Sequence, residues 1–291
     1  MSIKKWLNKN TASLSSKTVA ISGATGGIGR ELCHHLAYLG ASLVLLDRNM
    51  EKSHTLAESL RSQFPSVNIS HIQVDMEDID TVRSAADKLS AMTVDFLVLN
   101  AGAYSIPRHK CSTGYDNVFQ INFVSPYYLA ARLLSSIESR GGKVVAVGSI
   151  AHRYSKTDEC DVDFSVRDKA SLVYGNAKRY LMFSLCELSD GNSVVITHPG
   201  ITFTNITAHY PKLIFALIKH PMKIIFMKND TASLSILKGV FDTTRAYEWI
   251  GPRLFNVWGL PTKKKLKTAS RDEIDFIYNE AERIYSSLTQ E

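Results

Sequence analysis

A tyrosine and a lysine stand four residues apart in the stretch SLVYGNAK, residues 171–178, which we predict to be helical. Because positions i and i+4 are neighbours on a helix, the phenol of Tyr174 and the ammonium of Lys178 would share one face. A tyrosine has an ordinary pKa of about 10, and a nearby positive charge favours its phenolate. The pair is therefore a candidate proton carrier, although the same spacing also arises in helices by chance.

A glycine-rich segment, GATGGIG at residues 23–29, follows the first predicted strand and opens the first long predicted helix. Such a turn lets the backbone approach a pyrophosphate closely, and a helix N-terminus presents free N–H groups and a positive dipole end. The strand–turn–helix context favours a dinucleotide site over a plain tight turn. The residues expected to contact the dinucleotide here are Gly23, Thr25, Gly26, Gly27, Ile28 and Gly29.

Asp47 ends the second predicted strand, 18 residues after Gly29. An acidic side chain at this point would accept hydrogen bonds from the adenosine ribose hydroxyls and would repel a 2′-phosphate. Arg48 follows directly, and a guanidinium there can pair with that phosphate. We expect NAD as the cofactor and leave NADP open.

These motifs together resemble those of the short-chain dehydrogenase/reductase family, over residues 18–200. The family's TGxxxGIG is similar to SGATGGIG at residues 22–29, and its NNAG to LNAG at residues 99–102, which lacks the first asparagine. The resemblance also covers HPG at residues 198–200. It implies further cofactor contacts from Asp75, Met76, Asn100, Ala101, Gly102, Pro199, Gly200 and Thr204, and from Tyr174 and Lys178.

The same resemblance implies a catalytic set of Asn122, Ser149, Tyr174 and Lys178. Tyr174 would carry the proton, and Ser149 would hydrogen-bond the substrate oxygen. Lys178 would hold the nicotinamide ribose and lower the pKa of the tyrosine. Asn122 would keep a water in line between Lys178 and solvent. The hydride chemistry would belong to the nicotinamide.

The segment between Ser149 and Tyr174 spans 25 positions, about twice the spacing in compact members of the family. Its SIAH (149–152) and DVDF (161–164) stretches resemble the retinol-dehydrogenase-type branch. We expect the loop at residues 155–168 to affect the substrate range. His152 is expected to be a solvated loop residue.

Short apolar runs alternate with helix-length stretches through the first two hundred residues. This alternation predicts an α/β fold with a doubly wound parallel sheet, Rossmann-like, in a single domain over residues 1–291. We expect a helical substrate lid at residues 203–229 and a C-terminal extension at 251–291. Predicted strands are 18–22, 42–47, 69–74, 96–99, 143–149 and 193–197, and predicted helices are 27–39, 50–64, 79–89, 113–137, 171–188, 230–240 and 272–288.

The composition is that of an ordinary globular protein, with 45% hydrophobic and 21% charged residues. A net charge of +6 is too small and too spread out to predict a nucleic-acid partner. The four cysteines form no CxxC pair, which favours reduced thiols and no metal site. We find no signal peptide and no apolar run long enough to span a membrane, so we expect a cytoplasmic protein. The cysteines are Cys33, Cys111, Cys160 and Cys186.

We therefore predict an NAD(P)-dependent oxidoreductase acting on an alcohol/carbonyl pair, with a lipophilic small molecule as substrate. The alternative is a non-catalytic dinucleotide-binding sensor or scaffold. Residues 210–228 mix apolar and basic residues, which suits a lid and leaves open a peripheral membrane contact. Pairing of two copies into a homo-oligomer through helices 113–137 and 171–188 is also left open.

Overall fold

The computed structural model describes residues 2–189, 193–202, 226–266 and 269–290. Within them one eight-stranded sheet runs in the order β3-β2-β1-β4-β5-β6-β7-β8. Strands β1 to β7 pair in parallel, and β8 adds to β7 in the antiparallel sense. The strands are β1 (Thr18–Ser22), β2 (Ser42–Asp47), β3 (Ile69–Gln73), β4 (Phe96–Leu99), β5 (Lys143–Val147), β6 (Val194–Thr197), β7 (Glu248–Leu254) and β8 (Trp258–Lys265).

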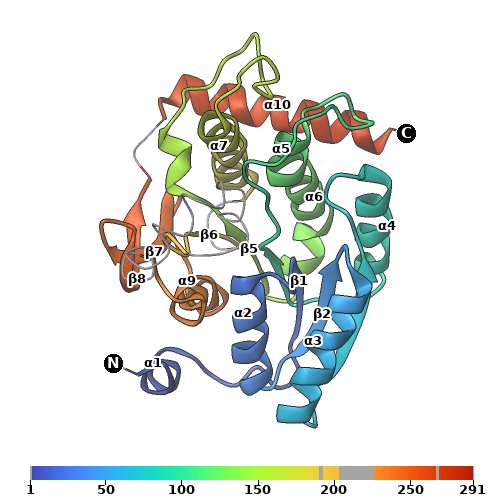
Figure 1. Cartoon of the computed structure of the whole chain (residues 1–291), viewed down its shortest axis with the longest axis vertical. Coiled ribbons are helices and arrows are strands. Elements are labelled where there is room, and N and C mark those ends of the chain that lie inside the picture. The colour runs from blue at the N-terminus through green and yellow to red at the C-terminus, as the bar shows by residue number, and fades with distance from the viewer. Residues whose placement is uncertain (1, 190–192, 203–225, 267–268, 291) are drawn as a thin grey trace, which may run out of the picture.

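Helices cover both faces of this sheet, which confirms the expected doubly wound, Rossmann-like architecture (Figure 1). The helices are α1 (Ile3–Asn10), α2 (Gly27–Tyr38), α3 (Met50–Gln63), α4 (Ile79–Ser90), α5 (Asn117–Phe119), η1 (Gln120–Val124), α6 (Ser125–Glu138), η2 (Ile150–Arg153), α7 (Ala170–Leu188), α9 (Asn229–Phe241) and α10 (Arg271–Thr289).

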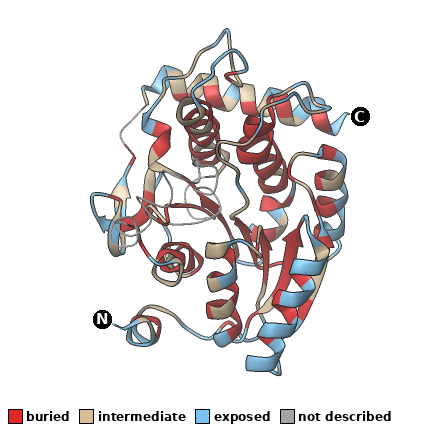
Figure 2. Ribbon diagram, viewed as in Figure 1, coloured by how far each residue is buried: buried red, intermediate tan, exposed pale blue. Residues whose placement is uncertain are grey.

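The strands are apolar on both sides, so successive residues enter two separate cores. Val19 and Ile21 of β1 pack with helices α1, α2, α3 and α9. Ala20, between them, joins the opposite core, under α4, α6, α7 and α10. Figure 2 shows the strands almost wholly buried and the outer faces of α3 and α4 exposed. Continuous apolar strands were therefore a reliable sign of a sheet covered on both faces.

Three parts of the fold differ from the sequence expectation. The predicted helix at 113–137 begins only at Asn117, and a π-helical turn, η1, interrupts it before α6. The polar N-terminal run forms α1, whose Trp6 and Leu7 are buried. Lys263–Lys265, where no strand was predicted, belong to the edge strand β8. Of the lid expected at residues 203–229, residues 203–225 lie outside the described residues.

Because the central strands are parallel, their carboxyl ends meet at one edge of the sheet. The strand order reverses between β1 and β4, and the chain leaves these two strands in opposite directions. Ligands of open α/β sheets bind in the crevice at such a point. The ends of β1, β4 and β5 place Ser22, Asn100 and Ser149 along this edge.

Candidate active site

The glycine turn between β1 and α2 has no room for a side chain at Gly23 or Gly29. A Cβ on Gly29 would lie 2.3 Å from the carbonyl oxygen of Gly23. Gly23 itself has a left-handed φ of +66°, and a Cβ on it would lie 3.0 Å from the Cα of Ala101. The backbone therefore forms an open cradle at the N-terminus of α2, which suits a phosphate group.

A cleft of about 370 Å³ opens above this cradle. The carboxyl end of β2 contributes the predicted Asp47 and Arg48 to its lining, and the segment after β3 contributes Asp75 and Met76. Sequence reasoning missed Lys52, one turn into α3, which also faces the cleft. The predicted residues in the lining are Gly23, Thr25, Gly26, Gly27, Ile28, Gly29, Asp47, Arg48, Asp75, Met76, Asn100, Ala101 and Gly102.

Ser22 and Asn100 fasten the turn to the end of β4. The Ser22 Oγ accepts hydrogen bonds from the backbone N–H groups of Asn100 and Ala101, both at 3.0 Å. The Asn100 amide donates to the carbonyl oxygens of Ser22 at 3.1 Å and Gly23 at 3.0 Å. Leu99, which replaces the asparagine usual in the family motif, is buried in the core. A serine and one asparagine are thus sufficient to fix the turn.

Asp47 has partners within the protein. One of its oxygens accepts from the backbone N–H and the hydroxyl of Thr25, both at 3.0 Å, and the other accepts from the Ser53 hydroxyl at 3.0 Å. The side chain is 3% exposed. Asp47 therefore stabilises the glycine turn. A ribose hydroxyl that also bonded to this carboxylate would share it with Thr25 and Ser53. Arg48, by contrast, is 71% exposed and lies 3.6 Å from Asp75.

Tyr174, Ser149 and Lys178 meet beyond Gly102, the lining residue next to the Lys178 ammonium. The Tyr174 hydroxyl is hydrogen bonded to the Ser149 side chain. The Lys178 Nζ lies 5.8 Å from the centre of the Tyr174 ring and donates to the Val147 carbonyl at 2.9 Å. Since Tyr174 and Lys178 are one turn apart on α7 and Ser149 follows β5, the sheet edge brings the three together.

Asn122 lies in the π-helical turn, next to this trio. Its amide donates to the carbonyls of Ala103 and Val118, both at 2.8 Å, and its Oδ1 accepts from the Ala103 N–H at 3.2 Å. A Cβ on Gly102 would lie 2.8 Å from that Oδ1 and 3.6 Å from the Lys178 Nζ. Asn122 is fully buried and holds the chain after β4 in place beside the lysine.

The acidification of Tyr174 by Lys178 that the sequence suggested is not seen in the protein alone. Burial raises the pKa of Tyr174 to about 12, the hydrogen bond from Ser149 lowers it, and the nearby Tyr104 phenol raises it. Burial lowers the pKa of Lys178 to about 8. At neutral pH the phenol therefore keeps its proton, and the ammonium still carries its charge.

His152 was wrongly expected to be a solvated loop residue. It is fully buried in η2, and its Nδ1 donates to the carbonyl of Ser149 at 2.6 Å. Burial lowers the pKa of His152 to about 4, so the ring is neutral at physiological pH. Its own carbonyl accepts from Arg179 at 3.1 Å, and Arg179 pairs with Glu273 of α10 at 2.6 Å. The C-terminal helix thus supports the strand end that carries Ser149.

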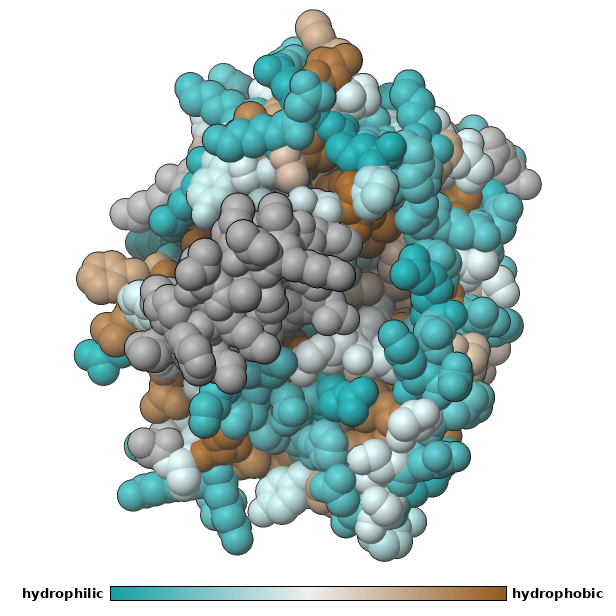
Figure 3. Space-filling model, in the orientation of Figure 1, coloured by the Kyte–Doolittle hydropathy of each residue, from teal (hydrophilic) through white to brown (hydrophobic). Residues whose placement is uncertain are grey.

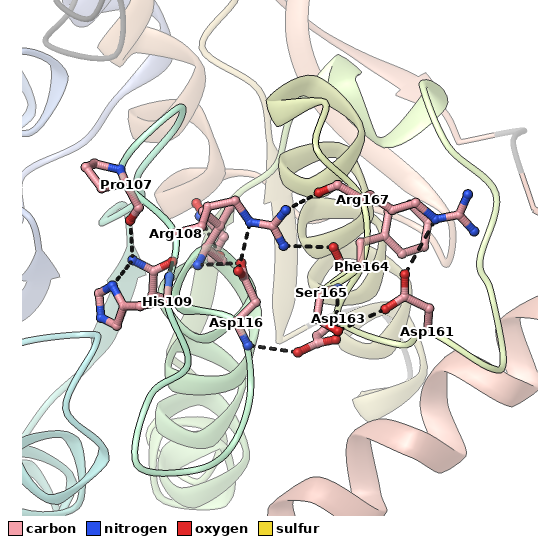
Figure 4. Close-up of polar contacts among 12 residues, drawn as sticks. Pro107, Arg108, His109, Asp116, Asp161, Asp163, Phe164, Ser165 and Arg167 are labelled. Atoms are coloured by element: carbon pink, nitrogen blue, oxygen red, sulfur yellow. Dashed lines mark hydrogen bonds and ion pairs between the residues drawn. The ribbon is translucent and has the colours of Figure 1, made fainter.

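Arg108 joins two loops that flank Tyr174 (Figure 4). Its Nε donates at 2.8 Å to Asp116, which lies in the same loop as Arg108, before α5. Its other nitrogens donate to the backbone carbonyls of Phe164, at 2.8 Å, and Arg167, in the loop before α7. The Asp116 N–H donates in turn to Asp163 at 2.8 Å. We call this set of bonds the Arg108 clamp.

A small apolar cluster lies beneath the Arg108 clamp. Val118, Phe164 and Val173 are buried together. Ile106 and Tyr174 pack against them, and Tyr104 meets the Tyr174 ring edge-on at 5.3 Å between ring centres. The long insertion between Ser149 and Tyr174 therefore packs on the tyrosine itself. Its spacing was visible in the sequence, but the clamp that holds it was not.

Five predicted cofactor contacts are not in the described cleft lining: Tyr174 and Lys178, which lie beyond Gly102, and Pro199, Gly200 and Thr204. Thr204 lies outside the described residues. Gly200, with a left-handed φ of +87°, packs against the β7–β8 turn, where a Cβ would lie 2.7 Å from the Val257 carbonyl. Pro199 precedes it in the same segment after β6.

Glu77, His109 and Cys111 bring potential metal ligands within 4.8 Å of one another. The His109 Nε2 already lies 2.5 Å from a Glu77 oxygen, and its Nδ1 faces the Asn117 amide nitrogen at 3.2 Å. The amide donates to Nδ1, so the proton lies on Nε2 and points at Glu77. The arrangement is a hydrogen-bonded pair beside a thiol, and we assign no metal to it.

The fold and this cleft define a Rossmann-type protein with a dinucleotide cradle beside a Ser-Tyr-Lys group. A family model described as short chain dehydrogenase matches residues 17–159. A short chain dehydrogenase of Aspergillus nomiae is 33% identical over 66% of this chain and 61% of its own length. Human retinol dehydrogenase 13 is 27% identical over 68% of this chain and 62% of its own length. These similarities support a short-chain dehydrogenase/reductase protein that resembles the retinol-dehydrogenase branch of that family.

The matched part of the chain spans somewhat less than two thirds of these relatives. Among solved structures, an uncharacterized protein from Mycobacterium paratuberculosis superposes with a TM-score of 0.73, over 97% of this chain and 96% of its own, at 22% identity. A short-chain dehydrogenase from Sphingobium yanoikuyae in complex with NADPH has a TM-score of 0.52, over 66% of this chain and 74% of its own, at 24% identity. At this identity the structures confirm the fold.

Proposed function

We propose that this protein is an NAD(P)-dependent oxidoreductase that interconverts an alcohol and a carbonyl compound. The observation that carries the proposal is the meeting of Ser149, Tyr174 and Lys178 just beyond Gly102, a lining residue of the glycine-lined cleft. A sensor or scaffold would need only the cradle at residues 23–29. A phenol and a serine hydroxyl beside a buried ammonium suit proton transfer, a step that a sensor would not perform.

The cleft fits a nicotinamide dinucleotide because four glycines, Gly23, Gly26, Gly27 and Gly29, line the place for its pyrophosphate. The turn at residues 23–29 would hold the phosphates, and Asp75 with Met76 would face the adenine end. Lys178, whose ammonium is close to Gly102, would hold the nicotinamide ribose. The bound nicotinamide would supply or accept the hydride.

The proton is the part of the reaction that the chain itself handles. With a pKa of about 12, Tyr174 is an acid that keeps its proton until a carbonyl oxygen gains charge. The Ser149 hydroxyl, already bonded to the phenol, would donate to the same substrate oxygen. In alcohol oxidation the phenol must first lose its proton, and the nearby Lys178 ammonium would stabilise the anion once the cleft is filled.

The rim of the cleft also accepts a 2′-phosphate. Arg48 is exposed at the end of β2, and Lys52 lines the cleft one turn into α3. Asp47, the group that would repel the phosphate, is buried and occupied by Thr25 and Ser53. We therefore propose that NADP binds at least as well as NAD, the cofactor favoured by the sequence.

A lipophilic substrate is supported by the apolar surroundings of Tyr174. The ring is flanked by Tyr104 and packs on the cluster of Val118, Phe164 and Val173. Such aromatic and aliphatic walls are typical of pockets for apolar ligands.

None of the helices in the described part of the chain is long and apolar enough to cross a membrane. We keep the cytoplasm as the proposed location, which cell fractionation would test.

The decisive experiment follows reduced-nicotinamide absorbance with lipophilic aldehydes, ketones and alcohols. Tyr174→Phe should abolish turnover and leave nucleotide affinity within about twofold, because only the proton carrier is removed. Tyr154→Phe is the matched control, since this phenol is 53% exposed and outside the cleft. Tight nucleotide binding without turnover of any substrate would instead favour the sensor. Full activity of Tyr174→Phe would remove the proposed acid.

A further inference from the structure

The β7–β8 hairpin exposes a concentration of large apolar side chains at its tip. Among the described residues seven large apolar side chains are exposed, and four of them are here. They are Leu254 (53% exposed), Phe255 (85%), Trp258 (38%) and Leu260 (36%). Figure 3 shows brown and tan side chains projecting at the left edge, where Figure 1 places this hairpin.

The backbone of the tip is unfavourable for the residue that it carries. Phe255 has a φ of +51° and Asn256 a φ of +59°. Asparagine and glycine tolerate this left-handed region, whereas a bulky phenylalanine is strained in it. The Phe255 side chain gains little burial in return. A strained and exposed phenylalanine contributes nothing to the folded chain, which indicates a contact outside the chain.

The tip is nevertheless held firmly. The Lys264 ammonium donates to the Pro252 carbonyl at 2.6 Å, the Arg253 carbonyl at 3.1 Å and the Asn256 Oδ1 at 2.8 Å. The His198 Nε2 donates to the Asn256 carbonyl at 3.0 Å, and His198 directly follows β6. The apolar side chains are therefore presented on a fixed support, so little conformational entropy is lost on binding.

The positive charge of the hairpin segment indicates which kind of partner it would bind. Residues 249–270 contain five basic and no acidic residues. Arg253 is exposed beside the apolar tip, and the Lys264 ammonium lies against the tip backbone, whereas Lys265 is at the base of the hairpin, opposite Glu248. A second copy of this surface would bring like charges together. An aromatic and aliphatic tip with a basic rim is instead complementary to a bilayer with anionic headgroups.

We propose that the β7–β8 hairpin is a membrane-surface contact that inserts Leu254, Phe255 and Trp258 into the interface of an anionic lipid bilayer. It is a different segment of the chain from residues 210–228, for which the sequence suggested such a contact. Gly200, after β6, packs against Val257 of the hairpin turn. Insertion would therefore bring the substrate end of the cleft close to the lipid. The proposal does not depend on catalysis.

The test is co-sedimentation of the full chain with phosphatidylcholine vesicles that do or do not contain phosphatidylserine. The wild type should bind the anionic vesicles, and added salt should weaken the binding. Phe255→Asn should lower the apparent affinity by about tenfold, because it removes one inserted aromatic ring. Asparagine suits the left-handed turn, so this variant should melt no lower than the wild type. Val166→Asn, at a side chain 76% exposed elsewhere, is the matched control and should bind normally.

Tryptophan fluorescence gives a second readout. Of the three tryptophans, Trp6 and Trp249 are buried, and Trp258 is on the hairpin. On anionic vesicles the emission should shift to shorter wavelength and be quenched by brominated acyl chains. Wild type that ignores anionic vesicles, Phe255→Asn that binds them equally well, or the absence of quenching would overturn the proposal. So would a dimer that Phe255→Asn dissociates without any vesicle binding, since the partner would then be a second copy.

Discussion

The two ends of the cleft are held in different ways. At the nucleotide end, the turn at residues 23–29 is shaped by backbone contacts and by the short polar side chains of Ser22 and Asn100. At the substrate end, the Arg108 clamp holds the loop that packs on Tyr174, and His152 holds the carbonyl of Ser149. The first end requires the absence of side chains. The second requires particular side chains to meet.

This difference has consequences for mutation. A close backbone approach cannot relax when a Cβ is added, so the nucleotide end should fail abruptly. Side-chain hydrogen bonds to carbonyls can be lost one at a time, so the substrate end should weaken by degrees. Nucleotide affinity and turnover should therefore respond separately to changes at the two ends.

Gly29→Ala should produce the largest effect. Its Cβ would lie 2.3 Å from the Gly23 carbonyl, so the turn would have to open and nucleotide affinity should fall by more than about a hundredfold. Gly26→Ala is the matched control, because its Cβ would lie 3.3 Å from the same oxygen. It should cost at most about tenfold. Titration of both variants with each dinucleotide checks this, and equal losses would contradict a backbone-shaped cradle.

A fall in pH should destabilise the substrate end of the cleft through His152. Burial lowers the pKa of His152 from 6.5 to about 4, so stability from its neutral form is present above pH 6.5 and is lost as the pH falls toward 4. This difference corresponds to about 3 kcal/mol of unfolding free energy. His152→Asn, which keeps an N–H for the Ser149 carbonyl, should lose less stability between about pH 7 and pH 4. Denaturant unfolding at both pH values measures it.

The exposed His54 provides the control for this experiment. His54→Asn should retain the full acid sensitivity of the wild type. An unchanged acid sensitivity in His152→Asn would mean that other groups determine it. Buried His198, whose pKa burial also lowers to about 4, would be the next residue to replace.

Arg108→Lys tests the clamp. A lysine keeps the charge but loses the planar fork that reaches Asp116 and two carbonyls, so the unfolding free energy should fall by roughly 1–3 kcal/mol. KM for the substrate should rise severalfold with nucleotide affinity unchanged. Arg167→Lys, at a 45% exposed side chain, should change little. Equal losses of nucleotide and substrate binding in Arg108→Lys would show that the two ends are not independent.

Most of the nucleotide end could be predicted from sequence because its signals are local. Glycine spacing and apolar strands located the turn, and the residues after β2, β3 and β4 proved to line the cleft. The occupied state of Asp47 was missed because it depends on Ser53, which only folding brings near. The burial of His152 and the Arg108 clamp were missed for the same reason: both depend on contacts far apart in sequence.

The smallest expected effect concerns the choice of cofactor. Arg48 is 71% exposed, so a contact to a 2′-phosphate would be largely screened by water. Arg48→Ser should weaken NADP by about tenfold and NAD by less than about twofold. Asp47→Ala should weaken both dinucleotides together, because it releases Thr25 from the turn. If Asp47→Ala instead weakens NAD alone, the carboxylate contacts the ribose after all, and the nucleotide end also depends on a side chain that recognises its ligand directly.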